Sequence, residues 1–297
     1  MARFGKVLTA MVTPFRDDGS LDLDAAAQMA RWLADNGNDG LVVAGTTGEA
    51  PTLTHDEQIE LIGAVAAAVD IPVVAGTGSN DTAAAVELTE RATGAGADGV
   101  LLVAPYYNRP SQAGLARHFR SVAAATSLPV VIYDIPVRTG RKVDTATLLE
   151  LAHGVDNIVG LKDAAGDPAE TAKFIAMAPD GFEVYSGDDS LNLALLAVGA
   201  VGFISVAAHW SGAEHTEMIA AFESGDVAAA RRINAGLIPS YDYETGPVAP
   251  NPIPAKAMMR LIGLSVGRCR PPLDVEPDGL AEAAASVLAG TRLGAHV

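Results

Sequence analysis

The sequence contains eight short runs of apolar, largely β-branched residues, separated by segments with helical character. Most runs begin roughly 25 to 35 residues after the previous one, which is the length of a strand–helix unit. Each run is nearly continuous in apolar residues, as expected for parallel strands buried on both faces. The predicted strands are residues 7–12, 40–44, 72–75, 99–104, 129–133, 158–162, 182–186 and 201–206.

Eight alternating units favour an α/β fold of one kind, a closed (β/α)8 TIM barrel, over an open doubly wound sheet. The strand pattern stops at Ser211, and three or four helices follow it. We therefore predict a barrel with the active site over residues 1–224 and a C-terminal helical extension over residues 225–297.

Helix-start signals lie between the predicted strands. Thr54 and Glu57 have the capping-box spacing, and so do Asp167 and Glu170, with Pro168 at the first helical position. Further predicted N-caps are Asn80, Ser111 and Asp144, and the glycines predicted to end helices are Gly37, Gly94 and Gly154.

Composition limits the kinds of partner and cofactor that the chain is expected to bind. The chain has 36 acidic and 20 basic residues, a formal net charge of −16, and no basic cluster that would bind nucleic acid. The single cysteine, Cys269, excludes an intrachain disulfide and a multi-cysteine zinc site, and the histidines lack metal-ligand spacing. With no signal peptide or membrane-length apolar run, we expect a cytoplasmic protein with neither metal nor membrane partner.

Active sites of such barrels lie at the C-terminal ends of the strands. Lys162 ends the sixth predicted strand, where burial would lower its pKa and favour the neutral amine that attacks a carbonyl. The competing interpretation is a lysine that ends a strand and reaches solvent. Taken alone, Lys162 favours that second interpretation; its neighbours at the barrel mouth favour the first.

Other strand ends carry complementary groups. Tyr133 could transfer protons if it is hydrogen-bonded to Thr47 and Tyr107, although tyrosines at strand ends more often only fill space. Thr46 and Thr47 lie between glycines, where backbone and hydroxyl donors can bind a carboxylate, but the same pattern is an ordinary tight turn. Arg138 could bind a substrate carboxylate or pair with a surface acid.

Two other patterns could indicate a metal site or a nucleotide site. Asp188 and Asp189 could bind magnesium, but a helix cap is the better interpretation. Residues 76–79 (GTGS) lack the third glycine of a dinucleotide motif and the lysine of a P-loop, which argues against nucleotide binding.

Several motifs in register resemble the dihydrodipicolinate synthase / N-acetylneuraminate lyase family. They are residues 45–49 (GTTGE), 105–110 (PYYNRP), Tyr133 with 135–136 (IP) and 138–140 (RTG), 160–163 (GLKD), 202–206 (GFISV) and 251–254 (NPIP). The resemblance covers most of the chain.

The resemblance implies a class I aldolase-type enzyme acting on pyruvate. Lys162 would form the pyruvate imine, so no cofactor is expected, and Tyr133 would transfer protons. Thr47 and Tyr107 would complete the relay, with Tyr107 supplied by a neighbouring subunit. Thr46 and Thr47 would hold the pyruvate carboxylate, and the main chain at Gly187 and Ile204 would lie in the same pocket. The family also implies a homotetramer of two tight dimers.

Arg138 discriminates within the family. In the synthase branch this arginine binds the carboxylate of L-aspartate-4-semialdehyde, and the sugar-acid lyases usually lack it. The resemblance therefore implies condensation of pyruvate with the semialdehyde to 4-hydroxy-tetrahydrodipicolinate, in diaminopimelate and lysine biosynthesis. Asp134 departs from the asparagine of many relatives.

The family's lysine feedback site implies a further role for His55, Asn80 and Tyr106, which match residues that line it. Ala84 and Gln58 replace the glutamate and histidine of lysine-sensitive relatives. Loss of that charged partner, typically worth about 1.5–3 kcal/mol, predicts weak or absent inhibition by lysine.

The sequence is compatible with three alternative functions. A pyruvate aldolase of sugar acids, of the N-acetylneuraminate or 2-keto-3-deoxygluconate type, would keep Lys162 and Tyr133. A non-catalytic keto-acid-binding barrel would have no need of this set of polar residues. A phosphate-binding isomerase barrel would use Gly187 and Gly202, which are weak evidence for it.

Overall fold

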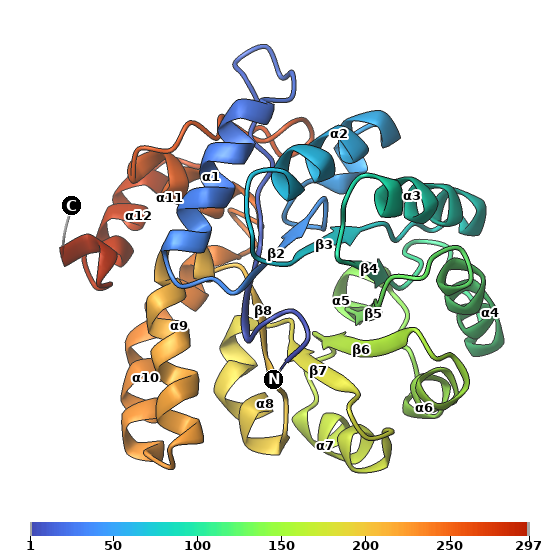
Figure 1. Ribbon diagram of the computed structural model, residues 1–297. Helices are drawn as coiled ribbons and strands as arrows, with labels where there is room; N and C mark the ends of the chain where they lie inside the picture. Colours follow the sequence, from blue (N-terminus) through green and yellow to red (C-terminus); the bar gives the residue numbers. More distant parts are fainter. Residues whose placement is uncertain (1, 296–297) are drawn as a thin grey trace.

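The computed structural model describes residues 2–295, and its centre is a closed barrel of eight parallel strands in sequential order, β1 to β8 (Figure 1). All eight predicted strands are confirmed, with ends that differ by no more than two residues. The strands are β1 (Val7–Ala10), β2 (Gly40–Val43), β3 (Val73–Gly76), β4 (Gly99–Val103), β5 (Val130–Asp134), β6 (Ile158–Asp163), β7 (Glu183–Ser186) and β8 (Gly202–Ser205).

Helices surround the barrel and confirm the predicted TIM-barrel class (Figure 1). They are α1 (Leu23–Asp35), α2 (His55–Ala66), α3 (Thr82–Gly94), α4 (Gln112–Ala123), α6 (Thr145–Gly154), α7 (Pro168–Met177), α8 (Asn192–Val198) and α9 (Ala208–Glu223). A one-turn helix, α5 (Pro136–Thr139), follows β5, and short 3-10 turns lie at Ala50–Thr52, Asp189–Leu191 and Leu293–Ala295.

Three more helices extend the barrel: α10 (Val227–Glu244), α11 (Ile253–Leu261) and α12 (Leu280–Leu288). Helix α9 contacts β1 and β8 and so serves as the eighth barrel helix, whereas α10 packs on α9 from outside, and α12 contacts α10 and α11 (Figure 1). The division of the chain at residue 224 stays a prediction; Met1 and residues 296–297 of the predicted units lie outside the described residues.

The helix-start signals are mostly confirmed. Thr54 and Glu57 form both bonds of the capping box, and the Ser111 hydroxyl accepts from Gly114 N. Asp167 caps α7 through two backbone N–H groups, but Glu170 does not complete a capping box. Its carboxylate instead accepts from Lys173 and from the Thr145 hydroxyl.

Other cap and termination predictions need correction. Asp81, not Asn80, caps α3, because its side chain accepts from Ala83 N. Asp144 occupies the N-cap position of α6 without a side-chain bond to the helix. Gly37 has the left-handed φ of 86° expected after α1, whereas Gly94 and Gly154 are the last residues within their helices.

The buried apolar residues form two main layers. One fills the space between the strands and the helices, and the other fills the barrel interior. Tyr133, Ile135 and Ile204 belong to the interior layer. Side chains at the C-terminal ends of the strands therefore lie between this packed interior and the barrel mouth. The polar groups collect at the mouth.

Candidate active site at the barrel mouth

Lys162 lies at the C-terminal end of β6, where Tyr133 of β5 and Tyr185 of β7 are its direct strand partners. The residue is only 5% exposed. Burial, and to a smaller extent the charge of Arg138, lower the pKa of the Lys162 amine to about 8. Asp189 and Glu244 oppose that shift. The amine is thus deprotonated far more easily than an exposed lysine.

Tyr133 forms the wall beside this amine. Its ring centroid lies 4.3 Å from Lys162 Nζ, and burial raises the pKa of its phenol well above the ordinary value. The Thr46 side chain acts in the opposite direction and offsets part of that rise. The chemistry open to such a phenol is proton transfer along a hydrogen bond, not reaction as a free phenolate.

Gly187, directly after β7, leaves the space that Lys162 occupies. A Cβ atom at Gly187 would lie 2.8 Å from both Cγ and Cε of Lys162. Its backbone N–H donates to the Asp163 carbonyl at 2.8 Å, which fixes the turn. Ile204 of β8 is buried in the barrel interior with Tyr133. Of the two predicted main-chain sites, Gly187 therefore lies against Lys162 and Ile204 lies in the barrel interior.

The turn of residues 44–49 follows β2 and brings two threonines to the mouth. Thr46 lines the cavity, whereas Thr47 is buried and its hydroxyl accepts from Asn251 Nδ2 at 2.9 Å. A hydrogen bond from Tyr133 to Thr47 was the condition for the predicted proton transfer; the side chain that lowers the pKa of the Tyr133 phenol is that of Thr46. Adjacent residues of a tight turn point in different directions, and sequence alone does not say which faces the tyrosine.

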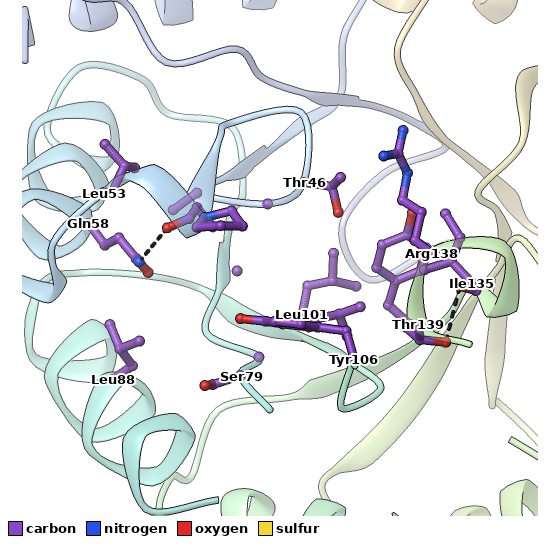
Figure 2. Close-up of a pocket in the computed structure, with 18 of the residues that line it drawn as sticks. Thr46, Leu53, Gln58, Ser79, Leu88, Leu101, Tyr106, Ile135, Arg138 and Thr139 are labelled. Atoms are coloured by element: carbon purple, nitrogen blue, oxygen red, sulfur yellow. Dashed lines mark hydrogen bonds between the residues drawn. The ribbon is translucent and has the colours of Figure 1, made fainter. Parts of the chain in front are cut away.

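Arg138 projects from α5 into the same cavity (Figure 2). Within residues 2–295 its guanidinium has neither an ion pair nor a hydrogen bond, so it is available to an anion. Asp134, by contrast, is 1% exposed, and its carboxylate accepts from Val143 N at 3.1 Å and pairs with Lys142 at 3.3 Å. Burial raises the pKa of Asp134 to about 6. Asp134 therefore supports the loop after β5.

A cavity of about 380 Å³ opens at the mouth. Thr46, Arg138 and Tyr106 line it from three places in the chain: the turn after β2, helix α5 and the segment after β4 (Figure 2). Its two ends differ: Thr46, Tyr133 and Arg138 line the end nearer the lysine strand, and apolar residues such as Leu53 and Leu88 line the other. The lining combines apolar walls with a few polar groups, the usual composition of a small-molecule site.

Tyr107 does not join this cavity within its own chain. Its side chain is 89% exposed, and its φ of 72° is left-handed, which is uncommon for a tyrosine. Tyr107 thus combines a strained backbone with an outward-facing aromatic ring. The predicted place of Tyr107 in a neighbouring subunit's relay stays a prediction.

Most of the residues assigned to a lysine feedback site line the same cavity. His55, Gln58 and Tyr106 line the far end of the cavity, and Gln58 Nε2 donates to the Ala50 carbonyl at 3.1 Å. Asn80 contributes only its backbone carbonyl, which accepts from Asn108. The regulatory role of these residues stays a prediction.

The acidic pair after β7 serves the structure. Asp188 caps the 3-10 turn through Ser190 N, and buried Asp189 accepts from Val206 N and Ala207 N at 2.8 and 2.9 Å. The helix-cap interpretation of the pair is confirmed for Asp188. Within the described part of the chain no group of three or more His, Cys, Asp or Glu side chains is placed to hold a metal ion.

For two buried residues the sequence predicted no role at the site. Asn251 is part of the family motif at residues 251–254, and Glu244 belongs to no motif; each is 7% exposed. No local pattern reveals them, because each meets the site only through a contact distant in sequence. Among residues 2–295, no helix has the length and apolar character needed to span a bilayer.

Fold and site together define a class: (β/α)8 barrels with a buried lysine of lowered pKa at the end of the sixth strand, beside a tyrosine and an arginine that has no ion pair among the described residues. Comparison with known proteins identifies the family. The model of the dihydrodipicolinate synthetase family matches residues 3–287, and the chain belongs to this family.

Relatives and solved structures agree. The chain is 50% identical over 273 residues to 4-hydroxy-tetrahydrodipicolinate synthase of Moorella thermoacetica, covering 91% of this chain and 92% of the relative. It is 51% identical over 276 residues to the synthase of Acidothermus cellulolyticus, covering 92% and 87%. The crystal structure of the Cyanidioschyzon merolae enzyme with lysine bound superposes with a TM-score of 0.95 at 41% identity, covering 99% and 100%.

Proposed function

We propose that this chain is a 4-hydroxy-tetrahydrodipicolinate synthase, which condenses pyruvate with L-aspartate-4-semialdehyde through an imine on Lys162. The observation that carries the proposal is the buried amine with a pKa of about 8 beside the Tyr133 ring. At pH 7.5 roughly a quarter of such an amine is neutral, against about 0.1% for an unperturbed lysine.

The chemistry balances without a cofactor. Neutral Lys162 Nζ attacks C2 of pyruvate, and loss of water gives the imine. Removal of a proton from C3 gives the enamine, whose C3 forms a bond to the aldehyde carbon of the semialdehyde. The amino group of that substrate then attacks C2, closes the ring and releases Lys162. Tyr133, whose ring lies beside the Lys162 amine, is placed to carry protons in these steps.

Arg138 supports the choice of second substrate. Its unpaired guanidinium in the cavity suits a bidentate bond to the carboxylate of the semialdehyde. Thr46 and Thr47, with the backbone of their turn, suit the pyruvate carboxylate. The chain as a whole is negatively charged, so these local cations and hydrogen-bond donors are what would hold the carboxylate groups of the two substrates.

Borohydride reduction in the presence of pyruvate, followed by peptide mass spectrometry, tests the imine. A reduced adduct on Lys162 is expected, and its absence would overturn the mechanism and favour a non-catalytic keto-acid-binding barrel. A panel of aldehydes supplied with pyruvate tests the second substrate. Turnover only with N-acetylmannosamine or sugar aldehydes would replace the synthase by a sugar-acid lyase.

We further propose a homotetramer of two tight dimers in the cytoplasm. The outward, strained Tyr107 supports a subunit contact, and the single cysteine is compatible with a reducing compartment. Mixing inactive Lys162→Ala and Tyr107→Phe subunits tests the contact. If Tyr107 acts in the neighbour's site, hybrids regain activity; additive inactivity after subunit exchange would contradict it.

A further inference from the structure

Residues of the C-terminal extension reach the substrate-binding turn of residues 44–49. Asn251 Nδ2 donates to Thr47 Oγ1 at 2.9 Å, across 204 positions of sequence. Lys256 Nζ lies 2.7 Å from Glu49 Oε1, with both side chains fully buried. Arg270 N donates to Glu49 Oε2 at 2.8 Å. The tail therefore contacts the turn at two separate side chains.

The turn needs this support because its backbone is strained. Ala44 and Glu49 have left-handed φ values of 56° and 57°, and neither is glycine. Such conformations are unfavourable for a residue other than glycine and persist only where surrounding contacts impose them. The Lys256–Glu49 ion pair fixes one end of the turn, and the Thr13 hydroxyl, which donates to the Gly48 carbonyl at 2.6 Å, fixes its middle.

The Asn251 contact has a different consequence, because it sets the direction of a hydroxyl. An amide NH2 group only donates, so the Thr47 oxygen accepts there. The one proton of the Thr47 hydroxyl is then directed to another acceptor. Thr47 is 3% exposed, so few orientations are open to it, and its neighbour Thr46 lines the cavity.

We propose that Asn251 is a positioning residue for the keto-acid substrate: it holds the Thr47 hydroxyl as a donor to the substrate carboxylate. This inference rests on the proposed function, since it requires pyruvate in the cavity. It gives the helical extension a part in substrate binding, separate from its packing against the barrel. Lys256 and Glu49 hold the backbone of the same turn, and Asn251 orients the side chain.

Titration with pyruvate under borohydride reduction tests the role, with adduct on Lys162 as the readout. In Asn251→Ala the half-saturating pyruvate concentration should rise about tenfold, the loss of one oriented hydrogen bond. The maximal adduct and the KM for the semialdehyde should stay unchanged. Asn251→Asp should raise it further, because a carboxylate only accepts, would reverse the hydroxyl, and repels the substrate anion.

A matched control is Asn157→Ala. Asn157 Nδ2 is likewise an amide donor, in this case to the backbone carbonyls of Ala123, Thr126 and Leu128, and it precedes β6 at the opposite end of the barrel. This variant should lose stability without any change in half-saturating pyruvate. Asn251→Ser, which removes the amide with a smaller change in polarity, is prepared in case Asn251→Ala does not fold, and should shift the titration in the same direction.

A double-mutant cycle with Thr47→Val separates orientation from general loosening of the turn. If Asn251 acts through the hydroxyl, Asn251→Ala adds nothing once that hydroxyl is gone. Unchanged half-saturation in Asn251→Ala, independent effects in the double variant, or an Asn251→Asp variant that binds pyruvate as tightly as wild type would each overturn the inference. Absence of adduct in the wild-type protein would instead overturn the proposed function, and with it the substrate that this role requires.

Discussion

Replacement of Gly187 by alanine should separate catalysis from stability in this enzyme. The added Cβ would lie 2.8 Å from Cγ and Cε of Lys162 and 3.2 Å from Cβ of Ala164. Since φ at Gly187 is not left-handed, the cost is steric rather than conformational. Lys162 is a flexible chain that can retract, so the barrel should still fold.

The size of the effect follows from the displacement. The new contact is about 0.6 Å shorter than the 3.4 Å at which ordinary packing begins, so the lysine stem must shift by a comparable distance. A displacement of about 1 Å at a reacting atom costs on the order of a hundredfold in rate. We expect imine formation in Gly187→Ala to be roughly 10- to 100-fold slower.

The assay is the rate of borohydride-trapped adduct on Lys162 at saturating pyruvate, with the thermal unfolding midpoint measured alongside. Gly236→Ala is the control: this glycine lies within α10, and an added Cβ meets no atom within 4 Å. That variant should keep the wild-type rate and gain about 0.5–1 kcal/mol of stability. A wild-type rate in Gly187→Ala would refute the view that this glycine makes room for the nucleophile.

Four further outcomes are expected. Adduct formation should rise with pH with a midpoint near 8, because the neutral amine attacks and burial lowers the pKa of Lys162 to about 8; a midpoint above 10 would contradict this. Arg138→Met should lower kcat/KM for the semialdehyde roughly 10- to 100-fold while the pyruvate adduct forms normally. Sub-millimolar L-lysine should leave most of the activity, and half-inhibition there would refute the prediction. Burial lowers the pKa of His209 to about 4, and its Nε2 accepts from Val12 N. Only the unfolded chain binds this proton between pH 6.5 and 4, so the free energy of unfolding should fall by up to about 3 kcal/mol as pH drops through that range, and less steeply in His209→Gln.

The barrel could be predicted because its signals are local. Parallel strands buried on both faces leave continuous apolar runs, and the Thr54–Glu57 box and the Ser111 cap mark helix starts within four residues. A local signal gave a wrong prediction at Glu170. Its carboxylate accepts from Lys173 and Thr145 and does not cap its own helix. A side chain with several partners within reach chooses by geometry that the sequence does not state.

The sequence by itself determined the strand order, and with it the lysine at the end of the sixth strand, because the carboxyl ends of parallel strands share one face. The tertiary structure decided how the groups at that face are used. Thr46 rather than Thr47 lowers the pKa of the Tyr133 phenol, and Asn251 reaches Thr47 from 204 residues away. Burial moved the Lys162 pKa. Desolvation and hydroxyl direction depend on every atom packed around a group, and only the closed fold brings those atoms together.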